Sequence, residues 1–458
     1  MTWMRRGLLA LMMVGWVAAC GGRGGGDTPP PTDEPGSPTP PQVISGSLKI
    51  HTPFKAPDKG TNAYAMLGDG TRFFKKLDAS GVVTFEDPSL VGPQDVTVVA
   101  HGADGFSRAY TYLALERPEV WLPGSWKSPP VTPQSAYITG KVKGMGDPSN
   151  VFVQAVGQTL WEGSTSVNAD GSFRLHVQGT LPAVVDLAVV ERDPSSPFKS
   201  KAVGLKRGIA LSAGQEVSGQ EVVLDHPINQ QTQLIIQGAE VYQQDHVSAS
   251  LMFFLDGEHF FETTKDRFGY PSPSGLPASL PSFSPTAPFD TVRATLALEV
   301  GAYSDLPSGR VNVWALAENL SSVTVSLPKP MTLTSPTALG PSYEPAPVLV
   351  NGPLVFQWSV DAAAQKVEFF MSPDFHNSAK LSWTVTAPGS VTSFKPFPLR
   401  LDETSFMYPS FHGAYRLSLD SYFDAAKGHY ADYFTQTPPN DPLTPAWQTS
   451  LEGGLYFR

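Results

Sequence analysis

Histidine and acidic side chains are the groups of this chain that could carry out acid–base or metal chemistry. The nine histidines are scattered singly, and no H-E-x-x-H motif occurs. His259 and Glu262 form an H-x-x-E spacing, but residues three apart on a strand face opposite sides of a sheet. Phosphate loops and dinucleotide fingerprints are absent from the sequence. We therefore expect neither a metal site nor a cofactor.

Pairs of carboxylates are the second candidate chemistry, because glycoside hydrolysis needs two that the fold brings together. Asp402-Glu403 and Asp420/Asp424 are the candidates near the C-terminus. Neither lies in a recognisable catalytic context, and solvated loop charges are the simpler interpretation. No G-x-S-x-G elbow is present either. The sequence predicts a protein without enzymatic activity.

Three further aspartates, Asp69, Asp104 and Asp170, lie beside glycines. Asp and Gly together favour tight turns, and turn formation explains these residues. A weak calcium site made from such loop carboxylates stays open as an alternative.

Cys20 is the only cysteine, and its surroundings predict its chemistry. Arg5 and Arg6 precede a short apolar run over 8–16, and Val17-Ala18-Ala19 places small residues directly before Cys20. The apolar run is too short to span a membrane, which takes ~20 residues. A basic start, a short apolar run and a small-residue site are typical of a cleaved signal. An ordinary secretory signal with a chance cysteine is the alternative.

Residues 1–20 resemble a bacterial lipoprotein signal with its lipobox. The resemblance implies that 1–19 is a signal peptide, that the mature chain begins at Cys20, and that Cys20 carries fatty acyl chains such as palmitate. Gly21 follows the cysteine, where an aspartate would often signal inner-membrane retention. We therefore expect a lipid-anchored protein of the cell envelope, in the outer membrane or at the cell surface.

Composition restricts the partners and the architecture. The formal net charge is −10, and charged residues make up 16% of the chain, below the typical ~25%. Without a basic patch, nucleic acid is not an expected partner. With Cys20 acylated, disulfides and thiol catalysis are excluded, so the domains must be held by sheet packing. A length of 458 residues suits three or four domains.

Residues 20–42 are rich in glycine and proline and predict a disordered tether. From Val43 onwards, short alternating runs separated by turn signals predict strands, and the fold class is all-β, with tandem β-sandwich domains. A repeat supports the first two domains, 43–127 and 134–228. Four pairs of segments match at near-constant offsets: 44–48 with 138–142, 62–67 with 150–155, 78–83 with 168–173, and 95–100 with 185–190.

The repeat resembles the carboxypeptidase-regulatory-like or transthyretin-like fold, with the turn over 168–173 as the nearest match to its D-A-D-G-x-F hairpin. The resemblance implies fold alone, because such domains are accessory modules and no peptidase chemistry comes with them.

A third β-sandwich is predicted over 232–333, and a fourth over 342–458. In the third, 266–290 form a long proline- and serine-rich loop that carries Tyr270, Phe283 and Phe289. These rings could bind a ligand, or they could attach the loop to its own sandwich. The fourth resembles a fibronectin type III-like domain, which implies that Trp358, Leu417 and Leu419 lie in its core.

The sequence thus predicts a lipid-anchored cell-envelope protein with a structural, adhesive or ligand-binding role. Its expected partners are the membrane, through the N-terminal lipid, and an envelope glycan or protein. The alternative is a carbohydrate-active enzyme or its glycan-docking accessory subunit.

Overall fold

The computed structural model describes residues 43–55, 62–102, 104–125, 132–157, 160–194, 196–242, 246–267, 276–301, 309–337, 339–341, 344–348, 353–374, 380–401, 405–407, 411–436 and 443–458. In these residues the expected all-β fold is confirmed. The helical elements among them are three short 3₁₀ turns, and none of them is long and apolar enough to cross a membrane. Cys20, the signal peptide and the tether lie outside the described residues.

The first unit, 43–125, contains two sheets packed face to face. One has the order β4-β1-β7, and the other contains β3-β2-β5-β6. The strands are β1 (Ser45–His51), β2 (Asn62–Leu67), β3 (Phe73–Lys76), β4 (Val82–Val91), β5 (Gln94–His101), β6 (Ser107–Leu115) and β7 (Glu119–Trp121).

The second unit, 132–227, also has two sheets, with the orders β10-β12-β8-β15 and β11-β9-β13-β14-β16. Its elements are β8 (Gln134–Lys143), η1 (Pro148–Asn150), β9 (Val151–Val156), β10 (Leu160–Glu162), β11 (Ser164–Ser166), β12 (Ser172–Gly179), β13 (Ala183–Asp193), β14 (Ser196–Leu211), β15 (Glu216–Val223) and β16 (His226–Pro227).

The first two units share one pattern of strand pairing. β1 pairs antiparallel with β4 and parallel with β7, and β8 pairs antiparallel with β12 and parallel with β15. The second sheets correspond as well, because β2 lies between β3 and β5 just as β9 lies between β11 and β13. This common topology is what the repeated segments in the sequence lead one to expect; the domain boundaries themselves stay a prediction.

The third unit, 228–327, places the small sheet β20-β17-β23 over the strands β19-β18-β21-β22. Its elements are β17 (Gln230–Gln237), η2 (Ala239–Val241), β18 (His246–Leu255), β19 (Glu258–Arg267), β20 (Ser279–Ser282), β21 (Arg293–Gly301), β22 (Gly309–Ala317) and β23 (Ser322–Ser326).

The C-terminal unit, 331–458, has the same two-layer plan, with the sheet β24-β26-β29 packed on strands of the large sheet. Trp358, Leu417 and Leu419 are buried in its core, as predicted. Its elements are β24 (Thr332–Ser335), β25 (Ala346–Val348), β26 (Phe356–Ser359), β27 (Lys366–Pro373), β28 (Leu381–Pro388), β29 (Ser393–Phe394), β30 (Leu399–Arg400), β31 (Phe406–Met407), β32 (Gly413–Asp424), η3 (Tyr430–Phe434) and β33 (Ala446–Phe457).

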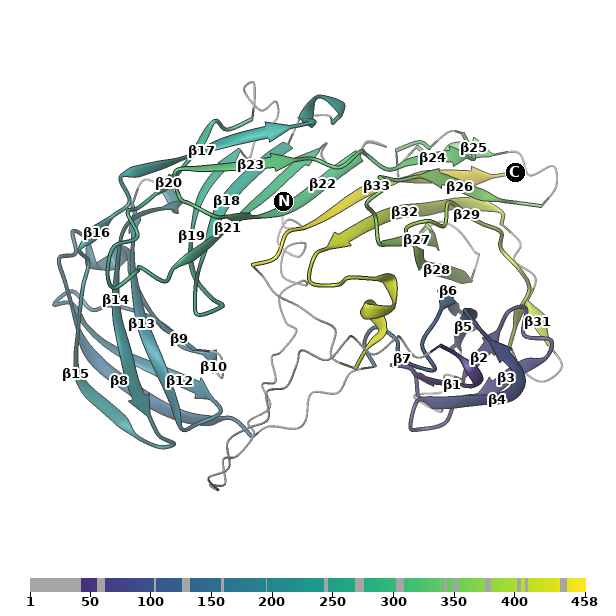
Figure 1. Cartoon of the computed structure of the whole chain (residues 1–458), viewed down its shortest axis with the longest axis horizontal. Helices are drawn as coiled ribbons and strands as arrows, with labels where there is room; N and C mark the ends of the chain where they lie inside the picture. The colour runs from purple at the N-terminus through teal and green to yellow at the C-terminus, as the bar shows by residue number, and fades with distance from the viewer. Residues whose placement is uncertain are drawn as a thin grey trace, which may run out of the picture.

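One continuous sheet joins three of the units, which the sequence did not predict. Its order is β19-β18-β21-β22-β33-β32-β27-β28-β6-β5-β2-β3, with β25 added beside β33. β33 pairs with β22 of the third unit on one side and with β32 on the other. β28 pairs parallel with β6 of the first unit. The units therefore form an arch, with the first and second units at its two ends (Figure 1).

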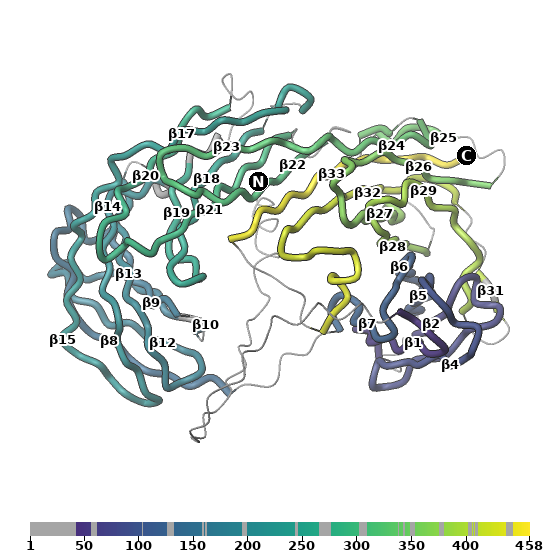
Figure 2. Tube along the Cα trace, viewed as in Figure 1, coloured from purple at the N-terminus to yellow at the C-terminus, as the bar shows by residue number. Residues whose placement is uncertain are grey.

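The junction between the first and C-terminal units is packed as well as hydrogen-bonded. Strands far apart in the sequence, such as β6 and β28, lie side by side there (Figure 2). Trp383 is fully buried, and its indole N–H donates to Thr111 Oγ1 at 2.9 Å. The turn η3 inserts Tyr430 and Phe434 into the core of the first unit, and Phe434 meets Tyr112 edge-on at 5.6 Å. The C-terminal unit therefore completes the core of the first unit.

Replacing Phe434 with alanine tests this packing. Because the ring is 1% exposed, we expect Phe434→Ala to lower the free energy of unfolding of the first unit by about 3–5 kcal/mol. The matched control is Tyr456→Ala, whose ring is 40% exposed, with an expected change within about 0.5 kcal/mol. Urea unfolding followed by tryptophan fluorescence measures both. Equal stability of the two variants would contradict the insertion of η3.

Candidate functional site

A cleft of about 530 Å³ lies where the second and third units meet. Its volume falls within the range of small-molecule sites, which often lie at domain interfaces. The second unit contributes β9, β10, β11 and β12, and the third unit contributes the start of β19. The lining residues are Gln154, Ala155, Val156, Gly157, Leu160, Gly163, Ser164, His176, Glu258 and His259.

The β18–β19 hairpin positions the acidic side of the cleft. Asp256 and Gly257 form its two-residue turn with φ of +51° and +87°. Two positive φ angles with the Asp-Gly pair are typical of a type I′ turn, which matches the twist of the strands it joins. Glu258 follows the turn directly and pairs with Leu255, so its position at the hairpin tip is fixed by backbone hydrogen bonds.

A β-bulge at Phe260 changes which side chains point outward. Phe253 pairs with Phe261 and Phe254 with His259, so Phe260 is an extra residue on β19. As a result, the adjacent rings of Phe260 and Phe261 are both buried. A bulge re-aims neighbouring side chains in this way and is common next to functional sites.

The bulge also corrects the expectation that His259 and Glu262 face opposite sides. They pair with Phe254 and Met252, which lie two apart on β18 and hence on one side of it. Both residues are exposed. Even so, the described residues contain no group of three or more His, Cys, Asp or Glu that could hold a metal ion.

The second unit supplies the opposite wall. Gln154 on β9 and Ser164 on the edge strand β11 are directly opposite each other in the ladder. Gln154 Nε2 donates to the backbone oxygen of His259 at 3.4 Å, across the junction. His176 on β12 packs against the ring of Tyr137, with 4.9 Å between ring centroids. The side chains of Gln154, Ser164 and His176 thus provide hydrogen-bonding groups on this wall of the cleft.

Arg207 on β14 holds the two walls together. Its guanidinium donates to the backbone oxygen of Pro288 at 3.0 Å and to Thr291 Oγ1 at 2.6 Å. The same group forms ion pairs with Asp186 and with Asp256 of the hairpin turn. Arg207 thus fixes the hairpin tip relative to the second unit.

Burial perturbs both titratable groups at the hairpin tip. It raises the pKa of the Glu258 carboxyl, and Glu258 Oε1 is a buried acceptor with no hydrogen-bond partner in the described part of the protein. Desolvation by the surrounding protein lowers the pKa of His259, although part of the side chain stays exposed, while a hydrogen bond with the Phe261 backbone acts in the opposite direction. The shift favours the neutral imidazole, which has one donor and one acceptor nitrogen.

The loop residues singled out in the sequence lie elsewhere. Phe283 and Phe289 are 1% and 0% exposed in the core of the third unit. The ring of Phe283 packs against Phe253 and Phe261, and that of Phe289 packs against Phe260 and Phe283. This is the packing role that was the alternative to ligand binding. Tyr270 lies outside the described residues. The loop is also shorter than expected, because β20 pairs with β17 within it.

Two of the four candidate carboxylates near the C-terminus are hydrogen-bonded strand residues. Asp420 and Asp424 lie on β32, not on a loop as predicted, because β32 extends to Asp424. Asp420 accepts hydrogen bonds from Gln448 Nε2 at 3.0 Å and Ser450 Oγ at 2.5 Å. Asp424 pairs with Lys427. Asp402 and Glu403 lie outside the described residues.

The turn aspartates behave as the sequence predicts. Asp69, Asp104 and Asp170 accept backbone hydrogen bonds from Thr71, Phe106 and Ser172 at 3.0, 2.9 and 3.0 Å, closing their own turns. The Ser172 hydroxyl is the main cause of the lowered pKa of Asp170.

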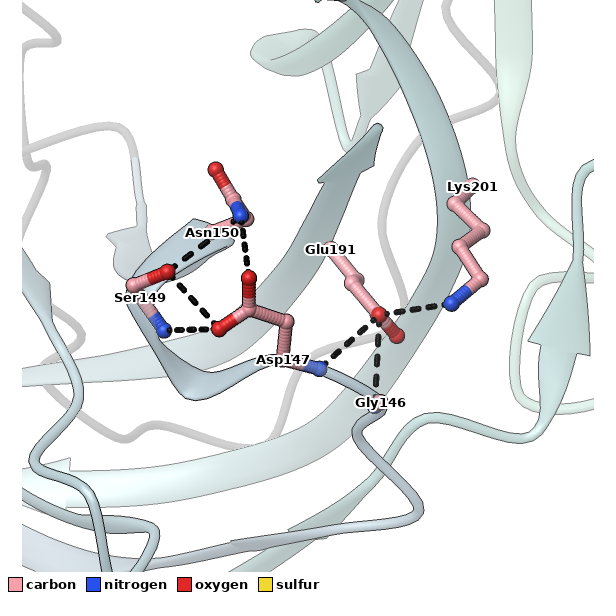
Figure 3. Close-up of polar contacts among 6 residues, drawn as sticks. All are labelled: Gly146, Asp147, Ser149, Asn150, Glu191 and Lys201. Carbon is pink, nitrogen blue, oxygen red and sulfur yellow. Dashed lines mark hydrogen bonds and ion pairs between the residues drawn. The ribbon is translucent and has the colours of Figure 1, made fainter. Parts of the chain in front are cut away.

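Glu191 on β13 is a buried carboxylate with a structural role (Figure 3). Glu191 Oε1 accepts hydrogen bonds from the backbone N–H of Gly146 at 3.2 Å and from Lys201 Nζ at 2.9 Å. Nearby, Asp147 caps η1 by accepting from the Ser149 N–H at 3.0 Å. Because Lys201 already supplies the positive charge, this cluster attaches the loop before η1 to β13 and β14.

Comparisons with known proteins give weak similarities. No family profile matches the chain, and no curated protein does. The chain is similar to a Bacteroides ovatus surface glycan-binding protein of a mixed-linkage glucan utilization locus, solved in complex with a mixed-linkage heptasaccharide. That similarity has 9% identity and a TM-score of 0.13 over 92% of this chain and 96% of that one. A Streptococcal ancillary pilin shows 9% identity and a TM-score of 0.13 over 62% and 89%. Scores this low carry no argument about function.

Glu258 should make stability depend on pH. Since its pKa is raised by folding, the native state binds the proton more tightly, and this contribution is lost as pH rises through the folded-state pKa. Glu258→Gln removes the cost of burying the charge. We therefore expect a higher Tm than wild type at pH 7 and no difference below about pH 4.

The control for this measurement is Glu221→Gln on β15, whose carboxylate is 50% exposed and pairs with Lys143. Its effect on Tm should stay small across the same pH range. Protonation of His259 occurs in all three proteins and largely cancels in the comparison. A Glu258→Gln protein that is less stable than wild type at pH 7 would contradict the desolvation of Glu258.

Proposed function

We propose that this chain is a lipid-anchored cell-envelope protein that binds a ligand in the cleft between its second and third units. The observation that carries the proposal is the buried, unpartnered Glu258 Oε1 in a cleft whose other polar lining side chains are those of histidine, glutamine and serine. A buried acceptor without a hydrogen-bond partner destabilises the protein, because the acceptor has lost its hydrogen bonds to water. A ligand that donates a hydrogen bond to this acceptor restores the lost interaction.

The rigidity of the junction supports a binding role. Backbone ladders fix the hairpin tip, and Arg207 ties it to the second unit. A preorganised site loses less entropy on binding than a mobile one. The arch therefore presents the cleft in a fixed geometry, without a need for closure.

The carboxylate content of the cleft favours binding over glycoside hydrolysis. A glycosidase needs two carboxyl groups about 5–10 Å apart. Among the described lining residues, Glu258 is the only carboxylate. The protein would therefore hold its ligand without cleaving it, as a binding or adhesive component of the envelope.

The proposal of a lipid anchor is based on the sequence around Cys20. We expect wild-type protein, expressed with its signal in a bacterial host, to incorporate labelled palmitate and to sediment with membranes. Cys20→Ser removes the acceptor thiol and should abolish both the label and the membrane association, while the matched variant Ser37→Ala retains them. Palmitate labelling of the Cys20→Ser protein would exclude the proposed anchor.

Replacing Ser164, at the edge of the cleft, with tryptophan tests whether the cleft is the binding site. Ser164 is exposed on β11, so the bulky ring of Ser164→Trp should fill the cleft without disturbing a core. Labelled polysaccharide and peptide fractions from bacterial envelopes serve as probes in fluorescence anisotropy. We expect the wild type to bind at least one fraction, and Ser164→Trp to bind it about tenfold or more weakly, a loss of about 1.4 kcal/mol.

The matched control is Ser218→Trp, which places the same ring on the exposed strand β15 of the same unit, outside the cleft. Its affinity should equal that of the wild type. Equal binding by Ser164→Trp and wild type, or no binding of any fraction, would refute the proposed function.

A further inference from the structure

The chemistry of the cleft walls restricts the charge of its ligand. Lysine and arginine are absent from the described lining residues, while Glu258 contributes a carboxyl group. An anionic ligand would lose its hydration without meeting a counter-charge. A metal cation would need several ligands, and the described residues provide no cluster of three. These walls therefore disfavour anions and metal ions, and they accept either an uncharged ligand or an organic cation that pairs with Glu258.

The polar groups of the cleft match hydroxyls. The Gln154 amide and the Ser164 hydroxyl each present donor and acceptor atoms, and the ring nitrogens of His176 and His259 can form hydrogen bonds with the same ligand. A ligand hydroxyl can likewise donate to Glu258 Oε1 and accept from a neighbouring N–H. Leu160 on β10 and the apolar residues Ala155 and Val156 on β9 form the apolar part of the wall. The C–H face of a sugar ring can pack against this part.

An extended peptide is the competing uncharged ligand. Peptides bind strands mainly by adding their backbone to a free sheet edge. In this cleft the unmet hydrogen-bonding capacity lies on a side chain, Glu258, at a hairpin tip. A side-chain acceptor surrounded by dual donor–acceptor groups suits a polyhydroxyl ligand better than a backbone.

We propose that the cleft between the second and third units binds a neutral saccharide, with Glu258 accepting a hydrogen bond from a sugar hydroxyl and His176 contacting the same ligand from the second unit. This inference rests on the proposed function, since it names the chemical class of the ligand that the cleft holds.

The test is isothermal titration calorimetry of the purified full-length protein against a panel that varies charge at constant size. The neutral probes are hexasaccharides of α-glucan, β-1,4-glucan, β-1,3-glucan, mannan and xylan. Hexagalacturonate is the anionic probe, glucosamine hexamer is the cationic one, and an uncharged glycine–serine peptide represents the backbone ligand. We expect binding of at least one neutral saccharide and none of the charged probes or the peptide.

Variants connect the binding to the cleft. Glu258→Gln replaces the carboxylate acceptor with a weaker amide acceptor, and His176→Ala removes a hydrogen-bonding ring. We expect each change to weaken binding of that saccharide about tenfold. Glu221→Gln, on exposed β15, is the matched control and should bind as the wild type does. Circular dichroism confirms that each variant is folded, and a folded variant with unchanged affinity overturns the assignment of its residue.

The outcomes separate the inference from the proposed function. Binding of a charged probe or of the peptide, with the affinity lost in Glu258→Gln, refutes the saccharide class but leaves the cleft as a binding site. Failure of every probe refutes the saccharide proposal. If, in addition, Ser164→Trp binds the envelope fractions as tightly as the wild type does, the proposed function is refuted together with the saccharide proposal.

Discussion

The parallel pairing of β6 with β28 is the interaction on which the arch depends. Six residue pairs, from Leu381–Ser107 to Thr386–Tyr112, join strands more than 260 residues apart. Without this pairing, each strand would be an edge strand with unpaired N–H and C=O groups, and such edges promote aggregation. The pairing closes both edges at once, and the packing of Trp383, Tyr430 and Phe434 follows from it. The first unit consequently shares its stability with the C-terminal unit.

Much of this architecture was predictable from local patterns. Alternating and repeated residues placed strands such as β1, β5, β8 and β13, since a period of two reports a half-buried strand directly. The repeated segments anticipated the common pairing pattern of the first two units. Neighbours in the sheet were not predictable, because alternation specifies which face a residue occupies and not which strand lies beside it. Pairs such as β22–β33 and β6–β28 arise from long-range packing that leaves no local sequence pattern.

The candidate site was missed for the same reason. His176 and Glu258 have no distinctive pattern in their own segments, and they line one cleft with His259 only because the second unit packs against the β18–β19 hairpin. One local signal was available: Asp256-Gly257 between apolar runs marks a tight hairpin, whose tip must protrude. The bulge at Phe260 has no such signal, and it reversed the expected orientation of His259 relative to Glu262. For Phe283 and Phe289 the sequence left ligand binding and attachment to the sandwich open, and the two rings fill the core beneath the loop.

The place of β33 in the large sheet determines the order in which the molecule can assemble. It pairs with β22 and β32, both of which precede it in the chain. A ribosome or a secretion pore that delivers the polypeptide from its N-terminus therefore releases two half-sheets with open edges first. Only the arrival of the β33 segment joins them, so the finished arch is a late, all-or-nothing product. Until that moment the edges of β22 and β32 stay open to pairing with other chains.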